Sequence, residues 1–77
     1  MATYQAHGVE GEYTFPIKVI EAESDAEAIE KVYESLYLKL RTCPIKLYQV
    51  PYYKSEMRAW REDEMRFVID IDMLALK

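Results

Sequence analysis

Apolar and polar residues recur with two different periods along this chain. Between residues 24 and 40 the apolar positions lie three or four residues apart, as they do on one side of an amphipathic helix. These positions are Ile29, Val32, Tyr33, Leu36 and Leu40. Ser24 and Glu27 form an S-x-x-E capping box, so we expect the helix to begin at Ser24 and to run to Leu40.

Shorter segments with period-two alternation favour β-strands. They cover residues 3–7, 13–23, 45–50, 57–61 and 65–73. Both glycines of the chain lie within residues 8–11, which we expect to form the turn between the first two strands. Pro16 has no amide hydrogen to donate, so the second strand is expected at an edge of the sheet.

The last strand shows the clearest alternation, with residues 62–64 as the turn before it. Its residues expected to face the helix are Met65, Phe67, Ile69 and Ile71. The element order is therefore β-β-α-β-β-β, and we predict an α+β fold in which one helix packs on a mainly antiparallel sheet. No repeat, linker or change in composition divides the chain, so residues 1–77 are expected to form a single domain.

Length and composition limit the chain to one hydrophobic core. It has 77 residues, of which 51% are hydrophobic. A chain of this length buries about 60–65% of its unfolded surface, which leaves room for a partner or for assembly into a homo-oligomer. No apolar run approaches the roughly 20 residues of a membrane span, and no basic region with a long apolar segment opens the chain. We expect a cytoplasmic protein without membrane contact.

The charge is unevenly distributed. Residues 1–40 carry eight acidic residues against three lysines, whereas residues 41–77 are nearly neutral, and the whole chain has a net charge of −4. Phosphate repels an acidic chain, so we expect no direct binding to nucleic acid and favour a protein partner with a basic surface. The alternative explanation is that the negative net charge only keeps the protein soluble, as in many small domains.

Few residues offer chemistry, and we predict no catalytic, cofactor or metal site. The chain has one histidine, His7, and one cysteine, Cys43. A single cysteine cannot form an internal disulfide, and these two residues are too few to ligate a structural zinc ion. Neither has a recognisable catalytic partner. Asp70 and Asp72, two residues apart on one strand, could share a hard cation, but a solvated sheet face is the commoner reason for this pattern. We therefore expect a protein that is not an enzyme.

Aromatic residues gather in the second half of the chain. Tyr48, Tyr52, Tyr53 and Trp60 lie in or between the third and fourth predicted strands, close to two arginines. Tyrosine and tryptophan carry large rigid rings with a polar tip and are common in interface hot spots. The segment has the composition of a recognition patch, and filling of the core is the alternative.

Two protein families resemble parts of this chain. The segment 21–24, the helix after it, and later the runs 59–63 (AWRED), 66–68 (RFV) and Asp70 resemble the layout of small phage-encoded anti-CRISPR proteins that inhibit type I surveillance complexes. This resemblance implies a phage or mobile-element protein that binds positively charged DNA-binding surfaces in the host cytoplasm. Separately, residues 15–50, and above all 26–34 (AEAIEKVYE), are similar to the archaeal LX and eukaryotic L18a ribosomal proteins, which implies a ribonucleoprotein component.

Our functional hypothesis is a non-enzymatic, acidic protein-interaction module. Its predicted binding residues combine the acidic side of the helix with the aromatic segment: Glu27, Glu30, Glu34, Tyr52, Tyr53 and Trp60. The alternative is the LX-like ribonucleoprotein component, and a small metal-dependent enzyme comes third.

Overall fold

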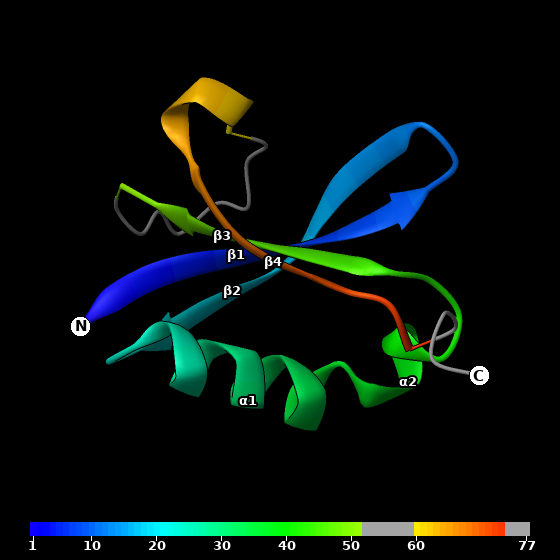
Figure 1. Cartoon of the computed structure of the whole chain (residues 1–77), viewed down its shortest axis with the longest axis horizontal. Helices are drawn as coiled ribbons and strands as arrows, with labels where there is room; N and C mark the ends of the chain where they lie inside the picture. Colours follow the sequence, from blue (N-terminus) through cyan, green and yellow to red (C-terminus); the bar gives the residue numbers. More distant parts are fainter. Residues whose placement is uncertain (52–59, 74–77) are drawn as a thin grey trace.

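In the part of the chain that the structure describes, four antiparallel strands form one sheet, and two helices lie against one side of it (Figure 1). The computed structural model describes residues 1–51 and 60–73. The elements are β1 (Ala2–Glu10), β2 (Tyr13–Ala22), α1 (Asp25–Ser35), α2 (Tyr37–Leu40), β3 (Ile45–Val50), the 3₁₀ turn η1 (Glu62–Glu64) and β4 (Arg66–Ile71). The strand order is β2-β1-β3-β4, so β2 is an edge strand as Pro16 predicts. The predicted α+β class is confirmed.

The first hairpin is longer than the glycine pattern predicts. β1 continues through Gly8 to Glu10, and only Gly11, with φ of 62°, adopts a backbone that favours glycine. Gly8 remains in the sheet because the ring of Phe15 fills the space of its missing side chain. A Cβ at Gly8 would lie 2.8 Å from Phe15 Cζ. The predicted turn at residues 8–11 is therefore wrong by three residues.

The helical segment is divided into two helices. Leu36 separates α1 from α2 with φ of −120° and ψ of 23°. Ser35 Oγ donates a hydrogen bond to the carbonyl oxygen of Lys31 (2.6 Å), a side-chain contact within the helix that bends helices. The single helix predicted to Leu40 is thus interrupted one turn before its end.

The main core lies between the helices and the sheet. Its fully or nearly fully buried side chains come from every strand and both helices: Tyr4, Ala6, Ile20, Ala22, Ala28, Val32, Leu40, Ile45, Leu47 and Ile71. Ile29 and Leu36 pack against this core as predicted. Tyr33 does not, since 42% of it is exposed, and the small Ala28 takes the buried position instead.

A bulge in β4 changes the predicted register. Leu47 of β3 pairs with Ile69, but the next residue, Tyr48, pairs with Phe67, so Val68 is the extra residue. Val68 packs against the core, while Phe67 is 50% exposed and its ring lies 5.7 Å from that of Tyr48. The prediction that Phe67 faces the helix is wrong because strict alternation cannot continue through a bulge.

The fourth predicted strand lies mostly outside the described residues. Of residues 57–61, Trp60 and Arg61 are described, and neither belongs to a strand. β3 pairs directly with β4, and η1 forms the predicted turn before β4, closed by a hydrogen bond from the Glu64 N–H to the Arg61 carbonyl (2.9 Å).

Side chains are also buried on the side of the sheet away from α1. Gln5, His7, Tyr48 and Val50 are each at most 5% exposed. The rings of His7 and Tyr48 are 4.9 Å apart, and Nε2 of His7 forms a hydrogen bond with Oε1 of Gln5 (2.9 Å). η1 lies on this side of the sheet, opposite α1 (Figure 1).

Candidate protein-binding surface

The start of α1 is capped by Ser24 and places Glu27 beside Lys31. The N–H of Glu27 donates to Ser24 Oγ (3.2 Å), which confirms Ser24 as the N-cap. The Glu27 carboxylate lies 3.3 Å from Lys31 Nζ. It therefore pairs with Lys31 and does not follow the reciprocal capping geometry that the S-x-x-E pattern predicts.

Glu30 and Glu34 form the more strongly acidic part of this side. Both are exposed, and they lie four residues apart on α1. Neither forms an ion pair with another residue in the described part of the chain. Two exposed carboxylates one helical turn apart, neither of them in an ion pair in the described ranges, favour a positively charged partner.

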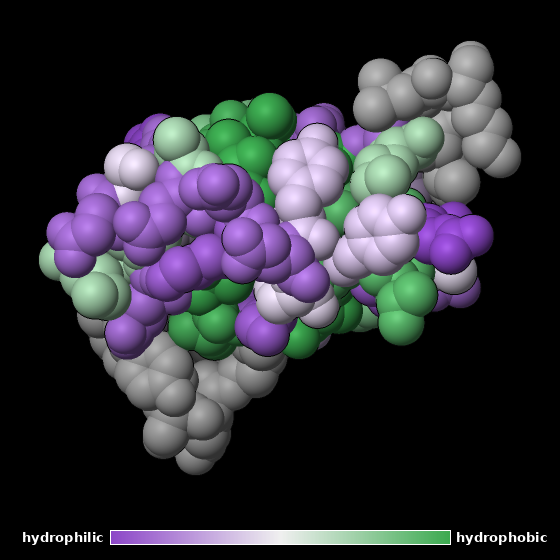
Figure 2. Space-filling model, turned by 90° about the horizontal axis from the view of Figure 1, so that it is seen from below, coloured by the Kyte–Doolittle hydropathy of each residue, from purple (hydrophilic) through white to green (hydrophobic). Residues whose placement is uncertain are grey.

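Exposed tyrosines lie beside these acids, and the sequence pattern did not identify them as surface residues. Tyr33 of α1 is 42% exposed, Tyr37 of α2 is 50% exposed, and Leu38 is 75% exposed. Figure 2 views the helices from outside and shows a hydrophilic area over α1 that passes into paler and apolar area toward α2. We define Glu27, Glu30, Tyr33, Glu34, Tyr37 and Leu38 as the outer helix surface.

The aromatic residues predicted to bind a partner are placed differently. Tyr52 and Tyr53 lie outside the described residues, so they remain predictions. Trp60 is buried, with 7% of it exposed. η1 begins two residues after Trp60 and lies on the opposite side of the sheet from α1 (Figure 1). Trp60 therefore has the burial of a packing residue and does not extend the outer helix surface.

A cluster of four side chains, those of Tyr4, Asp25, Gln49 and Arg66, joins α1 to the sheet. Asp25 accepts hydrogen bonds from the Tyr4 hydroxyl (2.6 Å) and from Arg66 Nη2 (2.7 Å). Arg66 Nε also donates to Gln49 (2.8 Å). The hydrogen bonds from Tyr4 and Arg66 lower the pKa of Asp25, whereas burial and the neighbouring carboxylate raise the pKa of Tyr4. The cluster holds the first turn of α1 in a fixed orientation.

The candidate chemical residues come from different elements of the fold. His7 is 3% exposed, and burial lowers its pKa. Cys43 is half-buried, and its N–H donates to the Lys39 carbonyl. Asp70 is exposed within β4, whereas Asp72 follows the end of the strand. Among the described residues, no three His, Cys, Asp or Glu side chains gather to hold a metal ion.

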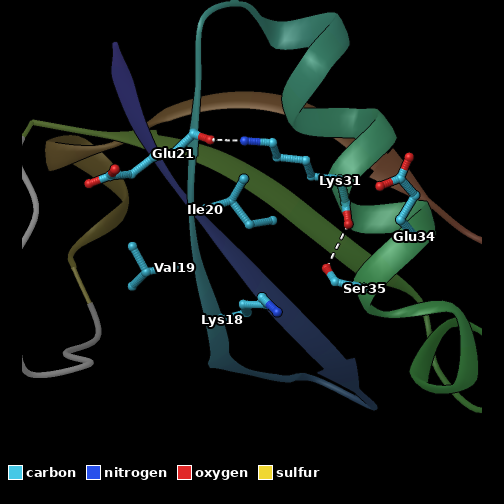
Figure 3. A pocket seen from close by; sticks show the side chains of 7 residues that line it. All are labelled: Lys18, Val19, Ile20, Glu21, Lys31, Glu34 and Ser35. Atoms are coloured by element: carbon cyan, nitrogen blue, oxygen red, sulfur yellow. Dashed lines mark hydrogen bonds between the residues drawn. The ribbon is translucent and has the colours of Figure 1, made fainter.

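A groove runs between the outer edge of β2 and α1 (Figure 3). Its volume is about 640 Å³, and it is lined by Lys18, Val19, Ile20, Glu21, Lys31, Glu34 and Ser35. Lys31 Nζ crosses the groove and donates to the carbonyl oxygen of Glu21 (2.6 Å). Glu34 belongs both to the groove and to the outer helix surface.

No protein-family model matches the chain, and no curated protein or solved structure is significantly similar to it. Both family resemblances therefore stay predictions. Neither α1 nor α2, the helices in the described ranges, has the length and apolar content that crossing a membrane requires.

Proposed function

We propose that this protein is a non-enzymatic interaction module that binds a basic protein surface through its outer helix surface. The observation that carries the proposal is the exposure of Tyr33 and Tyr37 directly beside Glu30 and Glu34. Carboxylates attract and orient a basic partner, and tyrosine rings supply contact area at a small cost in side-chain entropy. The Asp25 cluster supports the proposal, because its hydrogen bonds join the first turn of α1 to β1 and β4.

The proposed partner is a basic, nucleic-acid-binding complex in the host cytoplasm, which the protein inhibits by covering its charged surface. The resemblance to anti-CRISPR proteins motivates this finer proposal. An LX-like ribonucleoprotein component is the competing proposal, and it predicts contact with RNA instead of with a basic protein.

Reversal of the acidic charges tests the proposal. We expect the triple variant Glu27→Lys, Glu30→Lys, Glu34→Lys to lose at least tenfold in affinity for a partner isolated by pull-down from the native host. The wild-type affinity should fall steeply between 0.05 and 0.5 M salt, since exposed charges are screened over about 8–10 Å at physiological ionic strength. Calorimetry measures both effects.

A matched control separates the surface from the total charge. Glu10, Glu12 and Glu23 are exposed acids away from the outer helix surface, and their change to lysine alters the net charge equally. This control should retain most of the affinity. Equal losses in both triple variants would contradict the proposed surface, and RNA binding that strengthens in the first variant alone would favour the ribonucleoprotein alternative.

A second pair of variants tests the tyrosines. Tyr33→Ser and Tyr37→Ser should each weaken binding by about tenfold, because tyrosines at the centre of an interface commonly contribute more than 1 kcal/mol. Tyr13→Ser is the control, since Tyr13 is also largely exposed but lies at the tip of the first hairpin. An effect of Tyr13→Ser as large as that of Tyr33→Ser would argue against specific docking on the helices.

A further inference from the structure

The outer edge of β2 presents backbone groups that no strand in the described residues uses. The Glu21 carbonyl accepts its hydrogen bond from Lys31 of α1, so it points away from β1. In an antiparallel strand, the N–H and C=O of one residue point to the same side, and every second residue repeats that direction. The N–H and C=O of Val19 therefore also point into the groove.

The groove beside this edge has the size of a binding site. Its volume of about 640 Å³ lies within the range of roughly 300–1,000 Å³ that is typical of ligand pockets. Ile20 offers an apolar contact on the side of α1, and Val19 offers another on the opposite side of the strand (Figure 3). An extended chain laid along the edge would thus meet side-chain contacts on both of its sides.

The charge around the groove selects a basic occupant. Residues 18–35, which include all the lining residues, contain six acidic residues and two lysines. Of the two lysines, Lys31 is already paired with Glu27. Glu21 and Glu34 line the groove and form no ion pair within the described ranges.

We propose that the groove binds an extended, basic peptide segment of the partner, which adds to the sheet as a strand beside β2. The inference rests on the proposed function, since the peptide belongs to the same basic partner. Main-chain hydrogen bonds with Val19 and Glu21 supply affinity. Lysine or arginine side chains at alternate positions lie on one side of the peptide, where they meet Glu34 of α1, and the residues between them pack on Val19. Pairing is limited to residues 18–22, because Ile17 is the extra residue of a bulge and Pro16 precedes it.

Lys31 acts as a gate at this edge. Its hydrogen bond to the Glu21 carbonyl occupies one acceptor that an added strand needs. Positively charged side chains commonly protect edge strands from unwanted pairing in this way. A basic peptide displaces Lys31 by offering its own N–H groups and cations to the same oxygen atoms.

Three peptides test the mode of binding. The probes are acetylated, amidated hexapeptides: (Lys-Val)₃, the same sequence N-methylated at each residue, and (Glu-Val)₃. Only (Lys-Val)₃ should bind, since N-methylation removes the backbone donors and glutamate reverses the charge. In amide hydrogen exchange by NMR, (Lys-Val)₃ should protect Val19 and Glu21, whereas the Ile20 amide already faces β1 and serves as the internal control.

A pair of variants tests the gate. Lys31→Gln and Lys18→Gln remove the same charge from the groove, but only the first removes the bond to Glu21. Lys31→Gln should bind (Lys-Val)₃ about three- to tenfold more tightly than Lys18→Gln, the range expected from one released hydrogen bond. Melting temperatures check that both variants are folded.

The outcomes separate this inference from the proposed function. Binding of the N-methylated peptide, equal affinities of the two glutamine variants, or no protection of Val19 and Glu21 at millimolar peptide would overturn the edge-strand inference. Shifts confined to the outer helix surface would overturn it too, while leaving the proposed function intact. Protection at β2 that persists in a Glu27→Lys, Glu30→Lys double variant, which leaves the groove lining intact, would support the edge-strand inference and count against the acidic surface.

Discussion

Mild acidification should destabilise this protein through one residue, His7. This residue is 3% exposed, and burial lowers its pKa in the folded state relative to the ordinary value of 6.5. The unfolded chain therefore binds a proton more readily than the folded one. The stability is complete at pH values above 6.5 and falls as the pH decreases from there toward the lowered pKa of the folded state.

The size of this loss of stability follows from the number of protons that the chain takes up on unfolding. The chain contains one histidine, so below pH 6.5 unfolding takes up at most one proton at this position. The unfolding free energy then decreases by at most about 1.4 kcal/mol per pH unit. A domain of this size typically has about 4–12 kcal/mol of stability and loses about 4–8 °C of melting temperature per kcal/mol. The limiting decrease is therefore about 5–11 °C per pH unit.

Denaturant titrations between pH 5.5 and 8 measure this dependence. The window avoids the carboxylates, and the pKa of Asp25 is moved further from it by the hydrogen bonds from Tyr4 and Arg66. His7→Gln is the matched control, because its amide can still bond to Gln5 but does not titrate. A wild-type stability that stays flat from pH 7 to 5.5, or an equal slope in His7→Gln, would refute the assignment.

Three further predictions concern stability. Leu47→Ala should lower the free energy of unfolding, measured by denaturant titration, by about 2–5 kcal/mol. Ile69→Ala should lower it by less than half as much, because Ile69, which pairs with Leu47, is 36% exposed. Equal losses would contradict the described core. Ser24→Ala should lower the unfolding free energy by about 1 kcal/mol through loss of the N-cap, and an unchanged value would place the helix start elsewhere. Gly8→Ala should lower the melting temperature because its Cβ would meet the ring of Phe15, and Gly8→Ala combined with Phe15→Leu should recover part of the loss if this clash is the cause.

The predictable parts of the fold are those that depend on local chemistry. Ser24 can start a helix because its side chain reaches an amide three residues later, and the structure contains that bond. Pro16 belongs on an edge strand because it lacks an N–H, and β2 is at the edge. Each of these inferences needs only the residue and its near neighbours, so the sequence is sufficient for them.

The features that could not be predicted depend on contacts between distant residues. The bulge at Val68 is set by how β4 pairs with β3, and the sequence of β4 reads as a regular strand in either register. Gly8 remains in a strand because of Phe15 on the neighbouring strand. The Asp25 cluster joins residues 4, 25, 49 and 66, and no periodicity indicates it.

The candidate surface was predicted only in part, because some of its residues follow from the local pattern and others depend on distant contacts. Glu30 and Glu34 follow from helical periodicity and are exposed. Tyr33 was expected inside because its spacing matches the apolar stripe, but Ala28 fills the interface and leaves the larger ring at the solvent boundary. The groove beside β2 depends on where α1 crosses the sheet. That position results from the packing of several elements and cannot be inferred from the sequence of one segment.

The strand order has a consequence for how the chain reaches its native state. The two central strands, β1 and β3, come from distant parts of the sequence, and Thr3 pairs with Val50. A chain that has formed only the β1–β2 hairpin and α1 still has the inner edge of β1 open, and an open edge is a template for pairing with other chains. The shortest separation in this ladder, from Gly8 to Ile45, is 45 − 8 = 37 positions, and closing it slows folding relative to a helical bundle of equal length. Pairing of β3 with β1 is thus the step that covers this edge and lowers the tendency of the folding chain to aggregate.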